Sequence, residues 1–201
     1  MPPINLSKGG KINLTKSNPI NLAKKESLDF LHIGLGWDVK QGGGDNLDLD
    51  AMAVSINTDG KANPKYACNF SQLSTPDKAI HHLGDNLTGE GEGDDEVMQV
   101  YLSRLPQEIA EVHFRVVIYQ AATRGQHFGQ VSNAFIRLVD MSTRTELCRY
   151  TLGNEFSLAS AVSMGFVRRQ ASGEWEFEAE GAVIASIRAD QVREPSSCLV
   201  C

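Results

Sequence analysis

Short runs of alternating apolar and polar residues follow one another along most of this chain, and very few segments have the spacing of a helix. Side chains alternate between the two faces of a strand, so each run predicts a strand with one buried face. Turn residues (Gly, Asn, Asp or Pro) separate most of the runs. We predict strands over residues 28–35, 49–56, 65–70, 97–102, 112–119, 134–139, 146–151, 162–168, 175–179 and 183–187.

Only two segments, 75–79 and 106–110, read as single helical turns, each with a proline near its start. Residues 116–118, Val-Val-Ile, indicate a strand buried on both faces. About ten short strands with so little helix predict an all-β fold, an antiparallel β-sandwich. Loops gather at the ends of such a sandwich, where binding sites are held by a rigid frame.

The N-terminal stretch carries an eight-residue repeat, in which Ile-Asn-Leu recurs at residues 4–6, 12–14 and 20–22. Isoleucine and leucine two positions apart share one face of a strand, so the repeat predicts short edge strands or a β-meander. The chain has 201 residues, of which 41% are hydrophobic. We therefore expect one domain over residues 1–190, followed by a flexible C-terminal tail over residues 191–201.

Residues 84–96 break the pattern, because they read G-D-N-L-T-G-E-G-E-G-D-D-E, with six carboxylates and no basic residue. The formal net charge of the whole chain is -6, so this loop alone accounts for it. The six charges repel one another. The four glycines let the backbone bend so that side-chain and carbonyl oxygens converge. Converging oxygens without nitrogen or sulfur ligands suit Ca²⁺.

A second acidic segment, residues 44–50, begins with the same tetrapeptide as the first, Gly-Asp-Asn-Leu. The chain then continues as a strand, so Asp48 and Asp50 share one face. Two carboxylates on one face are unfavourable unless a cation lies between them. Asp38, on a preceding loop, is a third candidate ligand.

Composition excludes some classes of function. A pI near 5.4 argues against non-specific nucleic-acid binding, which needs a basic face. We find no signal-peptide pattern and no stretch of about 18 apolar residues, so a cytoplasmic location with reduced thiols is expected. The last four residues, Cys-Leu-Val-Cys, match the prenylation pattern C-a-a-X, which we interpret as a chance match in the tail.

Four segments, in this order, resemble the signatures of the TerD tellurium-resistance family. They are Gly-Trp-Asp at 36–38, Leu-Asp-Leu-Asp-Ala at 47–51, the acidic loop at 84–96, and Phe-Gly-Gln-Val-Ser-Asn-Ala-Phe-Ile-Arg at 128–137. The resemblance extends from about Ile4 to Gly181. One departure is that members often carry His-Asp before alanine after the buried strand, where this chain has Tyr119-Gln120.

The resemblance implies a β-sandwich that binds Ca²⁺ through its acidic loops, in a bacterial cytoplasmic stress-response protein linked to tellurite, phage and toxin resistance. It implies complexes with other proteins of the tellurium-resistance gene cluster, near the membrane, and no catalytic activity. Together with the residue patterns it predicts one composite metal site, or two adjacent sites, and not distant independent ones. The candidate ligands are Asp38, Asp48, Asp50, Asp85, Asn86, Leu87, Gly89, Glu90, Glu92, Asp94, Asp95 and Glu96.

Other interpretations of the acidic loop remain open. It is not an EF-hand, because Glu90 stands at the position of the invariant glycine and the flanks read as strands. Clustered carboxylates could also hold two divalent ions in a phosphoester hydrolase, belong to a Ca²⁺-dependent lectin-like sandwich, or be only a solvated loop. We interpret His81 and His82 as turn residues, and Arg137 as a paired or snorkelling charge within a strand.

Overall fold

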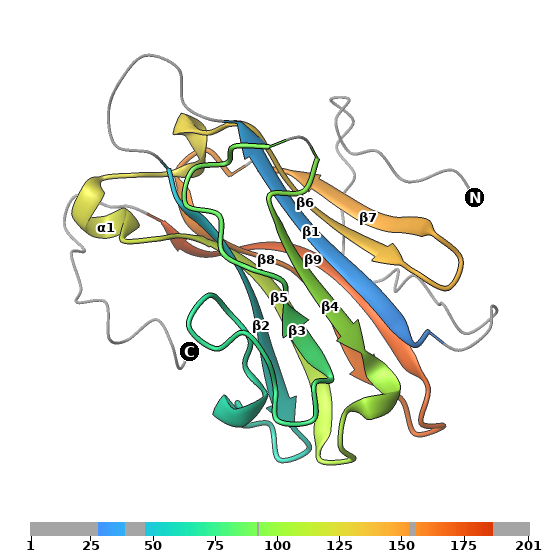
Figure 1. Cartoon of the computed structure of the whole chain (residues 1–201). Coiled ribbons are helices and arrows are strands. Elements are labelled where there is room, and N and C mark those ends of the chain that lie inside the picture. Colours follow the sequence, from blue (N-terminus) through green and yellow to red (C-terminus); the bar gives the residue numbers. More distant parts are fainter. Residues whose placement is uncertain (1–27, 39–46, 92, 153–155, 187–201) are drawn as a thin grey trace.

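Two antiparallel sheets packed face to face form the β-sandwich of the computed structural model (Figure 1). The structure describes residues 28–38, 47–91, 93–152 and 156–186. Three parts of the sequence analysis lie outside these residues: the N-terminal Ile-Asn-Leu repeat, residues 44–46 of the second acidic segment, and the C-terminal tail over residues 191–201. Within them the prediction of an all-β antiparallel sandwich is confirmed.

The first sheet has five strands in the order β3-β4-β1-β6-β7, and the second has four in the order β2-β5-β8-β9. The strands of the first sheet are β1 (Phe30–Asp38), β3 (Ile80–His82), β4 (Glu96–Tyr101), β6 (Ser132–Asp140) and β7 (Thr145–Thr151). Those of the second are β2 (Leu49–Asn57), β5 (Ile109–Ile118), β8 (Ala159–Arg169) and β9 (Trp175–Ser186). Helical segments are short: α1 (Ala121–Arg124) and 3₁₀ turns at Pro64–Tyr66, Leu102–Arg104 and Phe128–Gln130.

The core lies between the sheets and follows the period of two that the sequence predicts. In β1 Leu31, Ile33 and Leu35 are fully buried, and across the sandwich Phe114 and Val116 of β5 are as well. Burying each such side chain stabilises the fold by about 1.5–3 kcal/mol. In β5 the intervening residues are only half-buried, so the expectation of a strand buried on both faces is wrong.

Two of the predicted elements differ because local turn chemistry prevails. Residues 65–70 are not a strand: Pro64 begins a 3₁₀ turn, and the Asn63 side chain caps it by accepting from the Lys65 amide. Residues 106–108 form a non-helical turn, and Ile109 and Ala110 already belong to β5.

Three further differences concern strand limits. Residues 75–79 are a turn in which Thr75 Oγ1 accepts from the Ile80 amide, so no helical turn forms there. The next residues form β3, which the sequence analysis read as a turn. The two strands expected over 175–179 and 183–187 are one strand, β9, which passes through Gly181 at φ +58°.

One end of the sandwich brings together the end of β1, the beginning of β2 and the loop that connects β3 to β4 (Figure 1). This is the end at which the acidic segments were expected to meet. Among the described residues no helix is long and apolar enough to cross a membrane.

Candidate metal centre

Three aspartates from the two acidic segments meet at this end of the sandwich. Asp48 directly precedes β2, Asp50 lies within β2, and Asp85 lies in the loop between β3 and β4. One carboxylate oxygen from each lies within 4.8 Å of the other two. Asp48 and Asp50 are buried, at 8% and 2% exposure, whereas Asp85 is exposed. The two segments therefore share one locality, as their matching tetrapeptides led us to expect.

Burial and mutual repulsion disfavour the charged form of the carboxylates in the cluster. Burial raises the pKa of Asp50 to about 8, and the charges of Asp48, Glu96 and Asp85 add to the effect. Burial likewise raises the pKa of Asp48 to about 6, with further contributions from Asp85 and Glu96. Arg124 of α1 acts in the opposite direction on Asp48. A cation between the carboxylates would relieve this repulsion.

Two oxygens of the cluster lack a hydrogen-bond donor although they are buried, Asp48 Oδ1 and Asp50 Oδ2. A buried acceptor without a partner is rare, since its desolvation is not compensated. A cation bound between the carboxylates would give both oxygens a partner. The donor set is composed of oxygens alone, which fits Ca²⁺ or Mg²⁺ better than zinc.

Glu96 is a fourth acidic residue at the cluster, and it is held by backbone groups. Its Oε2 accepts from the Ala51 amide at 2.8 Å, and its Oε1 accepts from the Asn86 amide at 3.3 Å. The His82 Nε2 lies 3.3 Å from Glu96 Oε2, and both side chains are completely buried. Sequence reasoning missed His82, which was expected in a turn. The available signal was that His82 follows Ile80 at the spacing of one strand face.

The loop around Asp85 has a shape set by Asn86. The Asn86 Oδ1 accepts from the amides of Gly89 at 2.9 Å and Thr88 at 3.1 Å, so this side chain closes a tight turn. Leu87 and Glu90 are exposed at the tip of that turn. Gly89 packs directly on the Trp37 indole and has φ +72°, a conformation that glycine adopts without strain. Glu92 lies outside the described residues.

Trp37 ties the loop to β1. Its amide donates to Asp95 Oδ2 at 2.7 Å, and its indole Nε1 donates to the Leu47 carbonyl at 3.1 Å, directly before Asp48. Burial raises the pKa of Asp95, with the charges of Asp38 and Asp94 adding to it and the Trp37 amide opposing it. Trp37 is thus a buried structural link between both acidic segments, at 3% exposure.

Two of the predicted ligands make contacts outside the aspartate cluster. Asp38 is exposed and accepts from Asn133 Nδ2 at 2.6 Å. Asp94 is paired with His32 and Arg137 on the outer face of the five-stranded sheet. The expectation that Arg137 is a paired charge is confirmed. Gln120, the departure from the family pattern, is exposed and donates from Nε2 to Tyr119 Oη.

An open depression lies beside Asp85, and it combines apolar and acidic side chains. It is lined by Leu83, Gly84, Asp85, Asn86, Leu87, Thr88, Glu90, Asp95 and Val97. Leu83 and Leu87 are 52% and 58% exposed. The depression thus places two exposed leucines next to the acidic residues Asp85, Glu90 and Asp95.

The two cysteines in the described residues, Cys68 and Cys148, are buried. Burial raises the pKa of the Cys68 thiol to about 11 and that of Cys148 to about 12. Thiolates are the nucleophilic form, so neither residue is suited to soft chalcogen chemistry at neutral pH.

Comparison with known proteins identifies relatives over almost the whole chain. Residues 3–187 match the family model for the TerD domain. General stress protein 16U of Bacillus subtilis is 43% identical over 181 residues, covering 89% of this chain and 90% of that protein. Tellurium resistance protein TerD of Serratia marcescens is 40% identical, covering 89% of each. The crystal structure of a TerD homologue from Streptomyces coelicolor A3(2) superposes with a TM-score of 0.73 at 27% identity, over 86% of this chain and 96% of that one.

Proposed function

Because this chain belongs to the TerD family, we propose that it is a Ca²⁺-binding stress-response protein of the tellurite-resistance type, which acts through Ca²⁺-dependent contacts with other proteins. The observation that carries the proposal is the cluster of Asp48, Asp50 and Asp85, with two buried oxygens that lack a donor. Asp48, Asp50 and Asp85 would hold the ion, and Glu96, whose charge acts on both Asp48 and Asp50, is the further carboxylate beside them. No reaction step is assigned to the ion.

Calcium suits this cluster better than magnesium. Ca²⁺ accepts six to eight oxygen ligands in a flexible geometry, whereas Mg²⁺ demands a small octahedron and releases its water reluctantly. The ligands here come from a strand and from a glycine-rich loop, so their positions can adapt to the larger ion. We expect micromolar or tighter Ca²⁺ binding, and poor competition by Mg²⁺.

The ion would also prepare a surface for a partner. Asp85 belongs both to the aspartate cluster and to the depression lined by Leu83 and Leu87. Binding would neutralise Asp85 and order the loop, and so present the exposed leucines to a protein partner. The relatives are named as resistance or stress proteins, which favours such a role over catalysis. Other proteins of the tellurium-resistance cluster, in the cytoplasm or on a membrane surface, are the partners we propose.

Calorimetric titration with Ca²⁺ and with Mg²⁺ tests the proposal. Wild-type protein should bind Ca²⁺ more tightly than Mg²⁺, and Asp50→Asn should abolish or strongly weaken that binding. Asp59→Asn is the matched control, because Asp59 is an exposed aspartate in a turn far from the cluster. Equal affinities for the two ions, or normal Ca²⁺ binding by Asp50→Asn, would contradict the proposed site.

A further inference from the structure

We propose that Arg137 is a positioning residue for the acidic loop, and that Asp94 is the residue by which Arg137 holds the loop on the sheet. In this assignment Asp94 is no metal ligand, although it stands among the carboxylates of the loop. The contact between Arg137 and Asp94 involves protein groups alone. Its effect on Ca²⁺ affinity rests on the proposed function.

The Asp94 carboxylate is engaged on both of its oxygens. Arg137 donates from Nε to Oδ1 at 2.8 Å and from Nη2 to Oδ2 at 2.7 Å, and His32 Nε2 lies 2.8 Å from Oδ2. The Asp94 side chain is only 7% exposed. Burial alone would raise the pKa of Asp94, but the hydrogen bonds from His32 and Arg137 outweigh it and lower the pKa. A two-pronged arginine–carboxylate pair fixes orientation as well as distance.

Two glycines of β1 leave the space in which the loop lies. A Cβ on Gly34 would overlap the Asp94 carboxylate, and a Cβ on Gly36 would overlap the Gly93 carbonyl and the Phe135 ring. Gly34 is also the direct cross-strand neighbour of Arg137, so glycine and arginine lie on the same face of the sheet. Because Gly34 and Gly36 have no side chains, the loop can lie directly on the outer face of β1.

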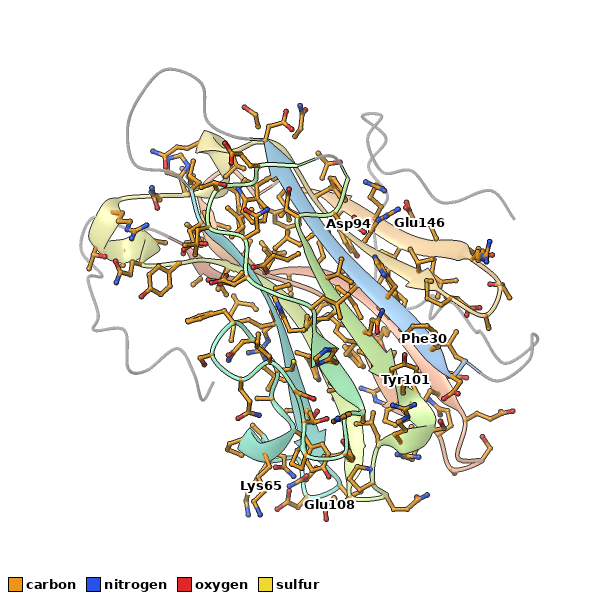
Figure 2. The ribbon with its side chains drawn as sticks, viewed as in Figure 1. Phe30, Lys65, Asp94, Tyr101, Glu108 and Glu146 are labelled. Atoms are coloured by element: carbon orange, nitrogen blue, oxygen red, sulfur yellow. The ribbon has the colours of Figure 1, made fainter. Side chains whose placement is uncertain are left out.

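Arg137 is in turn held from the far side. Its Nη1 lies 3.5 Å from Glu146 Oε2, and Glu146 accepts two bonds of 2.8 Å from Arg149. The Arg149 guanidinium lies 4.2 Å from the centre of the Phe135 ring. Figure 2 shows Asp94 and Glu146 on the same side of the molecule, over the strands β1, β6 and β7. The loop is therefore connected through Arg137 to the β6–β7 edge of the sheet.

The position of this contact in the chain gives it a role in metal binding. Asp94 is followed by Asp95, which bonds to the Trp37 amide, and by Glu96, which bonds to the Ala51 amide beside Asp50. At the other end of the loop lies Asp85, the exposed member of the aspartate cluster. If the loop leaves the sheet, Asp85 is placed correctly for only part of the time. The apparent Kd then rises by the inverse of that fraction.

Hydrogen exchange in the metal-free, full-length protein tests the contact without reference to any ion. Two reporters are the Gly89 amide, which donates to Asn86, and the Asp95 amide, which donates to the Leu35 carbonyl. Three variants should each speed exchange of both amides about tenfold or more: Arg137→Gln, Asp94→Asn and Gly34→Ala. Gly34→Ala is the sharpest of these, because it changes no charge and its φ is not of the left-handed kind.

Arg168→Gln is the matched control. It breaks an arginine–glutamate pair of 2.7 Å on the outer face of the other sheet, with Glu111, and should leave the loop amides unchanged. The Ile33 amide in the centre of β1 reports on the sheet itself. The contact is refuted if the loop amides exchange at wild-type rates in Gly34→Ala and Arg137→Gln, or if they exchange faster only to the extent that Ile33 does.

Titration with Ca²⁺ alone then tests whether a loosened loop weakens metal binding. We expect a Kd about tenfold higher in Arg137→Gln, with unchanged stoichiometry. Arg137→Lys should recover part of the affinity, because lysine keeps the charge but cannot make the two parallel hydrogen bonds to Asp94. A loosened loop with wild-type affinity would overturn the positioning role. Failure of the wild-type protein to bind Ca²⁺ would refute the proposed function, while the exchange data would still decide whether Arg137 holds the loop.

Discussion

The Ala51 amide donates to Glu96 Oε2 at 2.8 Å, and this bond joins the two sheets at the acidic end of the sandwich. Ala51 belongs to β2 and directly follows Asp50, whereas Glu96 opens β4 in the other sheet. The buried His82 lies against the same glutamate. The relative positions of the strand aspartates and the acidic loop are therefore set by the core of the protein, and not by the loop alone.

Metal-free protein should lose stability as the pH rises from 5 to 8. The folded pKa values of Asp48 and Asp50, about 6 and about 8, lie above the ordinary 3.8. Between these values the folded state holds protons that the unfolded state has released, so rising pH favours unfolding. One pKa unit corresponds to about 1.4 kcal/mol, so the fall should exceed about 1 kcal/mol.

Urea unfolding at pH 5 and pH 8 in chelator measures this difference. Carboxylates with lowered pKa, such as Asp94 and Glu146, complete their titration below this window and do not mask the effect. Asp50→Asn should remove most of the pH dependence. A stability that rises from pH 5 to pH 8 in the wild-type protein would show that the burial of Asp50 is not retained in solution.

Calcium should stabilise the fold. An ion that binds only the native state adds RT ln(1 + [L]/Kd) to the free energy of unfolding, which is about 2.7 kcal/mol at a hundredfold excess over Kd. Chelation should lower the melting temperature without abolishing folding, since the sheets pack through an apolar core. Scanning calorimetry with Ca²⁺ and with chelator checks both statements, and identical melts would indicate a merely solvated loop.

The aspartates of the two segments should act as one site. Asp48→Ala and Asp85→Ala should each weaken Ca²⁺ binding, and the double variant should depart from additivity because both residues share one ion. Titration of the three variants gives the coupling directly. Wild-type affinity and stoichiometry in Asp48→Ala, combined with loss in Asp85→Ala, would contradict a shared site.

His82→Ala should destabilise the protein even without metal. The side chain is completely buried and lies 3.3 Å from Glu96, so its removal leaves a cavity beside a buried carboxylate. We expect a loss of about 2–4 kcal/mol in the free energy of unfolding in chelator. His81→Ala is the control, since His81 is exposed on the opposite face of β3. Equal stabilities of the two variants would be incompatible with the buried pair.

Gly165→Ala should be far more harmful than Gly173→Ala. Both glycines have positive φ, of +154° and +88°, but only at Gly165 would a Cβ overlap backbone, at the Glu178 carbonyl. Backbone strain alone accounts for about 1–2 kcal/mol in each, and the overlap should add at least as much again at Gly165. Chemical denaturation of the two variants measures the difference, and equal losses would mean that β8 and β9 separate there at little expense.

The fold was predictable because burial alternates along most strands. Leu31, Ile33 and Leu35 show the pattern plainly, because all three are fully buried while His32 between them is not. The errors fall where side chains cap the backbone locally, as Asn63 does before Pro64, or where a strand has only three residues, as in β3. Such a short edge strand exists through pairing with β4, which no local pattern reveals.

The clustering of the acidic residues was predictable, but their individual contacts were predictable only in part. Repeated Gly-Asp-Asn-Leu tetrapeptides indicated that Asp48, Asp50 and Asp85 belong together, and the structure places them so. The sequence could not reveal that Asp94, Asp95 and Glu96 each accept hydrogen bonds from a different partner. Those partners depend on which backbone or side-chain donors the neighbouring strands present. Spacing along a chain says which residues are near, but not which donors they meet.

The three consecutive acidic residues at positions 94–96 bond to three different strands: β6 through Arg137, β1 through Trp37 and β2 through Ala51. This makes the end of the loop intolerant of changes in length. An inserted or deleted residue there would present each strand with the wrong carboxylate, or with none. Between Asn86 and Gly91 the loop bonds mainly to itself, and although Gly89 is buried against Trp37, Glu90 and Gly91 are exposed. A change in loop length, whether engineered or natural, should therefore be tolerated better at Glu90 and Gly91 than after Asp94.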